Sequence, residues 1–191
     1  GSSSGMMRRS ITSSPCSRAS AITVWRVMPL RKQSAIGVWM APSRVKKMLA
    51  PVHAKAAGLY MICTISKHKA EKKGYADAMM LDWQGRVAEC TGANIFFTRD
   101  GAIHTPIADC FLNGITRQTV IALAKEQGLD IIERRIMPEE LSSFNECFIV
   151  GSAAEVTPVA EIGPYSFKPG NISRTMMDAY TNAVRPKSKA A

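Results

Sequence analysis

The stretch AMMLDWQGRVAECTGANIFFTRDGAIHT, residues 78–105, decides the fold. It contains four short runs rich in apolar and strand-favouring residues, which are residues 78–82, 86–90, 94–98 and 102–105. The turn signals WQG and DG lie between neighbouring runs. Because short strands joined by tight glycine-containing turns commonly pair with their sequence neighbours, the stretch predicts a β-meander.

Helical patterns flank this meander. Residues 54–73 predict a helix with apolar side chains toward one side, a basic last turn and Gly74 as its end. A second helix is expected from Gly114 to Gly128. Beyond it, the patterns predict strands at 131–136, 147–150 and 156–162, a helical turn at 138–141 and a closing helix at 173–184. Strands and helices are mixed rather than strictly alternating, so the expected fold class is α+β with a mixed sheet.

Length and composition set the broad class of protein. The chain has 191 residues, of which 46% are hydrophobic and 21% charged, so one ordinary domain with a buried core is expected. Disorder, a collagen-like chain and a membrane span are disfavoured. The five cysteines are widely spaced, with no Cys-x-x-Cys pair and no histidine at zinc-ligand spacing. Neither a disulfide framework nor a metal site is expected, and reduced thiols in an intracellular compartment are the simplest interpretation.

The formal charge of +10 is unevenly distributed. Residues 1–70 contain no acidic side chain and hold twelve of the 25 basic ones, whereas residues 71–191 carry 13 basic and 15 acidic side chains. A role at a nucleic acid or a membrane surface would therefore depend on the first stretch. That stretch has no interleaved aromatic pattern and no RNA-binding motif, so we expect neither partner.

The chain divides into four parts. The leading GSSSG, residues 1–5, has the composition of a cloning scar. Residues 6–50 form a basic arm rich in Ser, Arg and Ala, which is typical of an organelle transit peptide and equally of a partly disordered arm. Residues 51–186 are the expected folded domain, and 187–191 a tail. A cytoplasmic location is expected, with a mitochondrial one as the alternative that the arm suggests.

One local pattern indicates an anion site by itself. In Gly114-Ile115-Thr116, a glycine is followed by backbone amides and a hydroxyl at the start of a predicted helix. Unpaired N–H groups and the positive end of the helix dipole suit a phosphate dianion. The same pattern also occurs at an ordinary capped helix, so both interpretations stay open.

Four motifs, in this order, resemble one enzyme family. They are PVHAKAAGLY at 51–60, AECTGANIF at 88–96, LNGITR at 112–117 and GSAAEVTP at 151–158. Together they resemble the fold-type IV pyridoxal-phosphate enzymes, and among these the branched-chain amino-acid aminotransferases. The resemblance covers roughly residues 39–186 and implies the larger, cofactor-binding aminotransferase domain of such an enzyme.

The resemblance implies roles for three side chains. Lys55 matches the lysine that forms a Schiff base with the cofactor and then moves a proton between the substrate α-carbon and the cofactor. Tyr60 matches the tyrosine that hydrogen-bonds the cofactor's phenolic oxygen. Glu89 matches the carboxylate that keeps the pyridine nitrogen protonated. Taken alone, these would be a solvated lysine, a half-buried core tyrosine and an exposed strand glutamate.

Further residues are implied at the cofactor and the substrate. Leu112, Ile115, Thr116 and Ser152 match cofactor-binding positions, and Thr116 and Ser152 would give hydroxyls to the phosphate. The turn at Ala153 and Ala154 would present backbone amides to the substrate carboxylate. The implied cofactor is pyridoxal 5'-phosphate.

The implied activity is transamination of branched-chain amino acids with 2-oxoglutarate by a homodimer. The family's smaller N-terminal domain, which supplies an arginine to the phosphate site, has no recognisable counterpart here, so impaired activity is expected. One alternative is a catalytically inactive cofactor-binding or interaction protein of the same fold. Another is a relative of the D-amino-acid aminotransferases or the aminodeoxychorismate lyases, which share the cofactor motifs.

Overall fold

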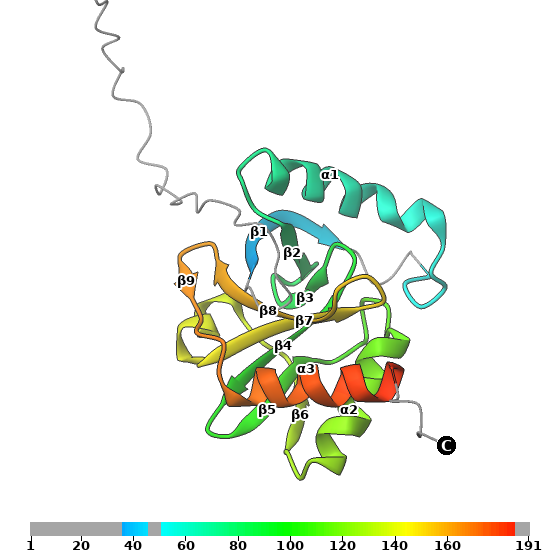
Figure 1. Ribbon diagram of the computed structural model, residues 1–191. Coiled ribbons are helices and arrows are strands. Elements are labelled where there is room, and N and C mark those ends of the chain that lie inside the picture. The colour runs from blue at the N-terminus through cyan, green and yellow to red at the C-terminus, as the bar shows by residue number, and fades with distance from the viewer. Residues whose placement is uncertain (1–35, 46–50, 186–191) are drawn as a thin grey trace, which may run out of the picture.

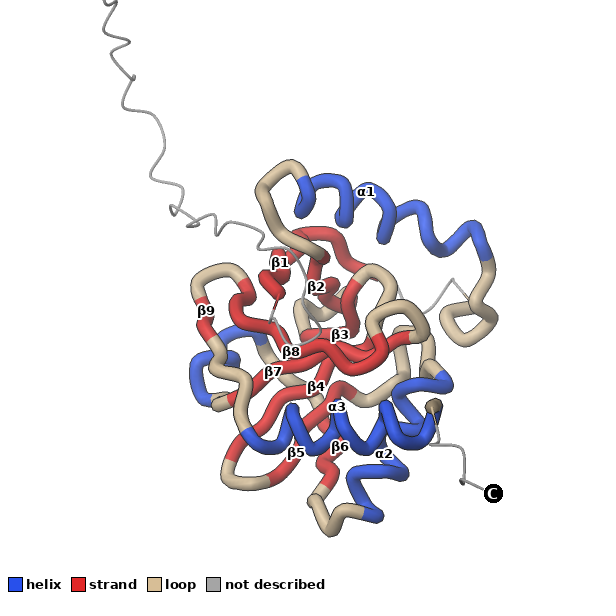
Figure 2. The backbone as a smooth tube through the Cα atoms, viewed as in Figure 1, coloured by secondary structure: helices blue, strands red, loops and turns tan. Residues whose placement is uncertain are grey.

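The structure is a computed structural model that describes residues 36–45 and 51–185 (Figure 1). In these residues one curled sheet is covered by three helices, as Figure 2 also shows. The strands are β1 (Ile36–Val45), β2 (Asp77–Asp82), β3 (Val87–Cys90), β4 (Asn94–Arg99), β5 (Ala102–Pro106), β6 (Ile131–Arg134), β7 (Glu146–Gly151), β8 (Glu155–Ile162) and β9 (Tyr165–Ser166). The helices are α1 (Tyr60–Glu71), α2 (Ile115–Glu126) and α3 (Asn171–Val184), with 3-10 turns η1 (Ala57–Leu59) and η2 (Pro138–Ser143).

The strand order is β3-β2-β1-β8-β7-β4-β5-β6, with β9 on β8, and both parallel and antiparallel pairs occur. This mixed α+β architecture confirms the expected fold class. The predicted β-meander is wrong, because β2–β3 and β4–β5 are two separate hairpins with β1, β8 and β7 between them. Strands β2 and β4 are almost completely buried. Each pairs on one side with its hairpin partner and on the other with a strand distant in sequence, β2 with β1 and β4 with β7.

Strand β1 lies within residues 6–50, the basic arm predicted from the sequence. It pairs in parallel with β2 and with β8 and so joins the two halves of the sheet. The side chain of Val38 is fully buried there. The rest of the arm, residues 6–35 and 46–50, lies outside the described residues, and so does the tail at 187–191.

The core has two principal clusters, one on each face of the sheet. Phe97 belongs to one and its neighbour Phe96 to the other, since successive side chains of a strand point to opposite faces. Phe96 stacks on Phe148 of β7 with ring centroids 5.2 Å apart, in the cluster that also contains buried residues of α2 and α3. Each such side chain contributes about 1.5–3 kcal/mol through burial. The central strands therefore give a rigid base to the loops at their ends.

The helix predicted at 54–73 begins later, because residues 57–59 form η1 and α1 starts at Tyr60. Lys55 has a φ of 47°, in the left-handed region, which a helix starting at 54 would not allow. Within the described residues no helix is long and apolar enough to cross a membrane.

Candidate active site

A pocket of about 810 Å³ lies among the loops at one edge of the sheet. Loops and ends of elements that are distant in sequence meet there: residues before α1, the end of β3, the start of β4, the start of α2 and the end of β7. Its lining includes Val52, Lys55, Gly58, Leu59, Tyr60, Met61, Ile62, Cys63, Glu89, Thr91, Gly92, Ala93, Asn94, Cys110, Phe111, Leu112, Asn113, Gly114, Ile115, Thr116, Val150, Gly151 and Ser152.

The sheet register brings two of these loops together. Strands β4 and β7 are antiparallel, and Asn94 pairs with Val150, so the start of β4 and the end of β7 share one edge. A Cβ atom on Gly151 would stand only 3.1 Å from the carbonyl oxygen of Gly92. Glycine at 151 therefore lets the turns at 91–93 and 151–152 pack closely beside the pocket.

Glu89 gives the pocket a carboxyl group in an unusual protonation state. Burial of the side chain raises its pKa to about 8, and the negative charge of Asp77 adds to this, whereas the positive charge of Lys55 opposes it. Strongly shifted carboxyl groups in pockets are frequent at catalytic and binding sites. A cation bound next to Glu89 would stabilise its charged form and lower this pKa.

Lys55 supplies an amine to the same pocket. Its Nζ atom lies 5.8 Å from the ring centre of Tyr60, the first residue of α1. Its φ of 47° is uncommon for a residue with a side chain and costs about 1–2 kcal/mol. Strained backbone of this kind clusters at functional sites, so the conformation of Lys55 favours a role beyond that of a solvated surface lysine.

The start of α2 forms another wall. Its N-cap is Gly114, which has no side chain to cap the first turn, and Thr116 in that turn is buried. The first N–H groups of a helix have no partner within the helix and carry its positive dipole end. Gly114, Ile115 and Thr116 all line the pocket, so this helix start is placed to receive an anion.

The structure thus brings together seven of the nine side chains expected at the site, namely Lys55, Tyr60, Glu89, Leu112, Ile115, Thr116 and Ser152. Ala153 and Ala154 follow Ser152 but do not line the pocket. The carbonyl oxygen of Ala154 accepts a hydrogen bond from the hydroxyl of Thr157 at 2.6 Å. The individual roles of all nine residues stay predictions.

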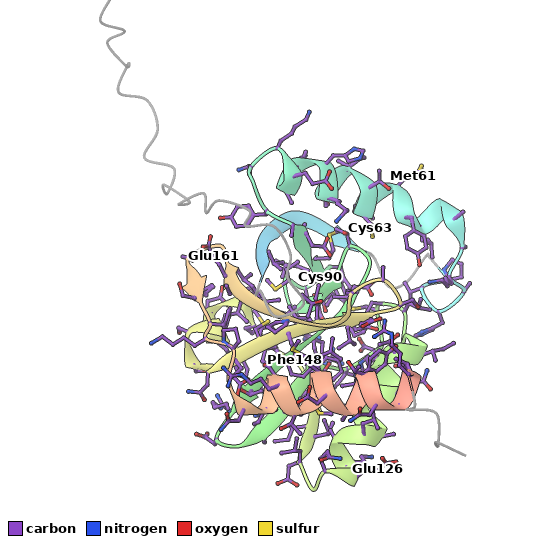
Figure 3. The ribbon with its side chains drawn as sticks, in the orientation of Figure 1. Met61, Cys63, Cys90, Glu126, Phe148 and Glu161 are labelled. Carbon is purple, nitrogen blue, oxygen red and sulfur yellow. The ribbon has the colours of Figure 1, made fainter. Side chains whose placement is uncertain are left out.

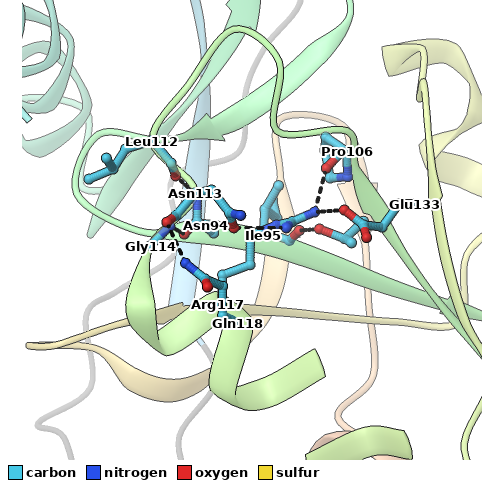
Figure 4. Close-up of polar contacts among 10 residues, drawn as sticks. Asn94, Ile95, Pro106, Leu112, Asn113, Gly114, Arg117, Gln118 and Glu133 are labelled. Atoms are coloured by element: carbon cyan, nitrogen blue, oxygen red, sulfur yellow. Dashed lines mark hydrogen bonds and ion pairs between the residues drawn. The ribbon is translucent and has the colours of Figure 1, made fainter. Parts of the chain in front are cut away.

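Sequence reasoning missed Asn94. Its side chain is buried, and its amide donates to the carbonyl oxygen of Leu112 at 2.9 Å and to Glu89 Oε2 at 3.4 Å. Its Oδ1 atom accepts the N–H of Gly114 at 3.3 Å (Figure 4). A polar residue directly before the apolar run Ile95-Phe96-Phe97 was the only sequence signal, because these contacts span up to 20 residues.

Two thiols line the pocket without being nucleophiles. Burial raises the pKa of Cys63 to about 11 and that of Cys110 to about 12. Figure 3 shows Cys63 on the inner side of α1, whereas Met61 points outward and is 69% exposed. Both thiols stay protonated near neutral pH and act there as small apolar groups.

Comparisons with known proteins show which family the sequence resembles. The family model for amino-transferase class IV matches residues 3–162. A probable branched-chain-amino-acid aminotransferase of Rickettsia conorii is 45% identical over 129 residues, covering 66% of this chain and 44% of that protein. The chain therefore spans about half the length of the relatives that it matches.

Solved structures show the same likeness. A branched-chain aminotransferase from Thermoproteus uzoniensis, solved with norvaline, has a TM-score of 0.79 and 37% identity, over 83% of this chain and 54% of that one. The branched-chain amino acid aminotransferase of Thermobaculum terrenum in its PLP form has a TM-score of 0.76 and 34% identity, with the same two coverages. Because the family model covers most of the sequence, the chain belongs to the class IV amino-transferase family.

Proposed function

We propose that this chain is the cofactor-binding part of a branched-chain amino-acid aminotransferase. It binds pyridoxal 5'-phosphate and exchanges the amino group between branched-chain amino acids and 2-oxoglutarate. The observation that carries the proposal is one pocket in which the amine of Lys55, the carboxyl group of Glu89 and the start of α2 all take part in the lining. The relatives' names and the PLP-form structure support it.

The donor set of the pocket fits the cofactor. Its phosphate would bind at the backbone N–H groups that begin α2, with the hydroxyls of Thr116 and Ser152 beside them. The pocket volume of about 810 Å³ is in the range usual for small-molecule sites. When bound, pyridoxal phosphate supplies an aldehyde carbon and an electron-withdrawing ring.

Lys55 and Glu89 would have different roles toward the bound cofactor. The Lys55 amine would hold the cofactor and would be placed to move a proton at the substrate α-carbon. Glu89 would hold a proton on the ring nitrogen, because a positive ring would offset the burial that raises the pKa of this carboxyl group to about 8 in the cofactor-free pocket. The ring centre of Tyr60 lies 5.8 Å from Lys55 Nζ, within the range of a cation–π contact.

We expect transamination by this chain alone to be slow. None of the described residues that line the pocket is an arginine. A charge-assisted hydrogen bond contributes about 1.5–3 kcal/mol, so a phosphate held without one binds about ten- to a hundredfold more weakly. Lys55 and Met61 of the pocket lining are also exposed, so water can enter, which disfavours an oriented proton transfer. We further propose that the protein works as a homodimer, in the cytoplasm or, if the arm is a transit peptide, in mitochondria.

Mapping the modified lysine tests the proposal. The purified chain is incubated with pyridoxal phosphate, reduced with borohydride and digested, and the labelled peptides are identified by mass spectrometry. We expect the label at Lys55, its loss in Lys55→Ala and its retention in Lys69→Ala, an exposed lysine of α1. Label spread over many lysines with none favoured at 55 would overturn the proposal. Conversion of pyridoxal phosphate to pyridoxamine phosphate by L-leucine, compared with D-alanine, then tests the substrate class.

A further inference from the structure

We propose that Asn94 is a positioning residue that holds the start of α2 and the carboxylate of Glu89 in a fixed relation across the pocket. This inference rests on the proposed function, in which the cofactor phosphate binds at the start of α2 and the ring nitrogen faces Glu89. Asn94 contacts both groups through one side-chain amide. Figure 4 shows its contacts with Leu112 and Gly114.

The anchor of this amide is rigid. Asn94 begins β4, where its Cα pairs with Val150 of β7, and its side chain is 6% exposed. The next residue, Ile95, is fully buried, and its carbonyl oxygen accepts the Thr105 hydroxyl of β5 at 2.9 Å. Both neighbouring strands therefore fix the backbone from which the Asn94 side chain extends.

The hydrogen bonds allow only one orientation of the amide. The nitrogen donates to Leu112 and Glu89, and the oxygen accepts from Gly114. A flipped amide would place its nitrogen, a donor, against the Gly114 N–H, which is also a donor. Its oxygen, an acceptor, would face the Leu112 carbonyl oxygen, which is also an acceptor. Asn94 thus uses both of its N–H groups and its oxygen for the turn 112–114 and for Glu89.

Close packing at residue 114 agrees with this contact. A Cβ atom at Gly114 would stand 2.7 Å from Asn94 Oδ1, so only glycine lets the helix start approach this amide. From the other side, Arg117 Nη1 donates to Asn113 Oδ1 at 3.0 Å and Gln118 Nε2 donates to the Asn113 carbonyl at 3.1 Å. The turn that begins α2 is therefore held between β4 and the helix itself (Figure 4).

The test compares Asn94→Ala and Asn94→Asp with the wild-type chain and with Asn182→Ala, an exposed asparagine near the end of α3. Asn94→Asp keeps the volume and the acceptor for Gly114 but loses both donated bonds. Dissociation constants are measured for pyridoxal phosphate and for pyridoxal, which lacks the phosphate. Hydrogen exchange of the cofactor-free protein is followed in peptides covering residues 110–118.

We expect both Asn94 variants to bind pyridoxal phosphate about tenfold or more weakly, to lose less affinity for pyridoxal, and to exchange amides faster around residues 112–116. Asn182→Ala should match the wild type. A loss of stability alone would lower both affinities in the same ratio. An unchanged ratio of the two affinities, or unchanged exchange at this turn, overturns the role of Asn94. If the wild type binds neither compound, the proposed function fails, and hydrogen exchange still decides whether Asn94 holds the turn.

Discussion

Arg117 and Glu133 form an ion pair that crosses from α2 to β6, with Arg117 Nη2 2.7 Å from Glu133 Oε2. The arginine is almost completely buried, whereas the glutamate side chain is 47% exposed. The same Nη2 atom donates to the carbonyl oxygen of Pro106 at 2.9 Å. Arg117 therefore connects the first turn of α2 to β5 and β6 of the sheet (Figure 4).

Replacing Arg117 should destabilise the fold more than replacing its partner. Arg117→Met leaves the carbonyl of Pro106 and the side chain of Asn113 without their donor, and we expect a loss of about 2–3 kcal/mol in the free energy of unfolding. Glu133→Gln should cost less than about 1 kcal/mol, because that side chain is solvated. Urea unfolding measures both. Arg174→Met, on the exposed side of α3, is the control, and a similar loss there would contradict this reading.

The local elements of this fold could be predicted, and their pairing could not. Apolar runs and glycine turns were sufficient for β4 at Asn94–Arg99 and for α2, because each depends on residues a few positions apart. The order of the strands depends on contacts such as β1 with β8, which join residues more than 100 positions apart. Turn signals carry no information about such pairs, and this is why the expected meander was wrong.

The same distinction holds at the pocket. Lys55, Glu89 and Thr116 lie in motifs with recognisable neighbours, so their common site could be anticipated from the resemblance. The contacts of Asn94 with Leu112 and of Arg117 with Glu133 join residues 18 and 16 positions apart. They exist only because the loop before α2 folds back on β4 and because β6 lies beside β5, which the sequence alone does not indicate.

His104 should make stability depend on pH. Burial lowers its pKa below the ordinary 6.5, and the positive charges of Arg134 and Arg99 lower it further. Its Nδ1 atom accepts a hydrogen bond from Arg134 Nε at 3.2 Å, which requires that nitrogen to be unprotonated. The unfolded chain therefore binds the proton more readily, so stability falls as the pH drops below about 6.5.

Urea unfolding at pH 7.5 and pH 5.5 measures this effect. We expect the wild type to lose more stability between these values than His104→Gln does. His68→Gln, at an exposed position in α1, should retain the wild-type dependence. An identical pH dependence in the wild type and His104→Gln would show that His104 does not titrate abnormally.

Glu146 caps α3 from a distance. Its buried carboxylate accepts the N–H groups of Gly170 and Ser173, both at 2.9 Å, and that of Ile172 at 3.3 Å. Glu146→Ala leaves these donors unsatisfied and should cost about 2–4 kcal/mol, whereas Glu146→Gln keeps one acceptor oxygen and should cost about half as much. Chemical denaturation checks this, with exposed Glu126→Ala as the control (Figure 3). A loss below about 0.5 kcal/mol in Glu146→Ala would contradict the cap.

Glu89 should destabilise the cofactor-free fold at alkaline pH. Because burial raises its pKa to about 8 from the ordinary 4.5, the folded chain retains a proton that the unfolded chain has lost. Stability therefore falls as the pH rises from about 4.5 to about 8, by about 1–3 kcal/mol in a pocket that water can enter. Glu89→Gln cannot lose this proton and should be more stable than the wild type at pH 8.5.

The cofactor should reverse this penalty. A positively charged ring nitrogen beside Glu89 stabilises the carboxylate, so saturating pyridoxal phosphate should raise the melting temperature of the wild type more at pH 8.5 than at pH 6. Glu89→Gln should still bind the cofactor, without this pH dependence, and its conversion of the cofactor by L-leucine should be about a hundredfold slower or more. Equal turnover in the wild type and Glu89→Gln would show that Glu89 does not face the ring nitrogen. If pyridoxal phosphate raised the melting temperature of the wild type equally at pH 6 and pH 8.5, Glu89 would likewise be shown not to face the ring nitrogen, without any measurement of activity.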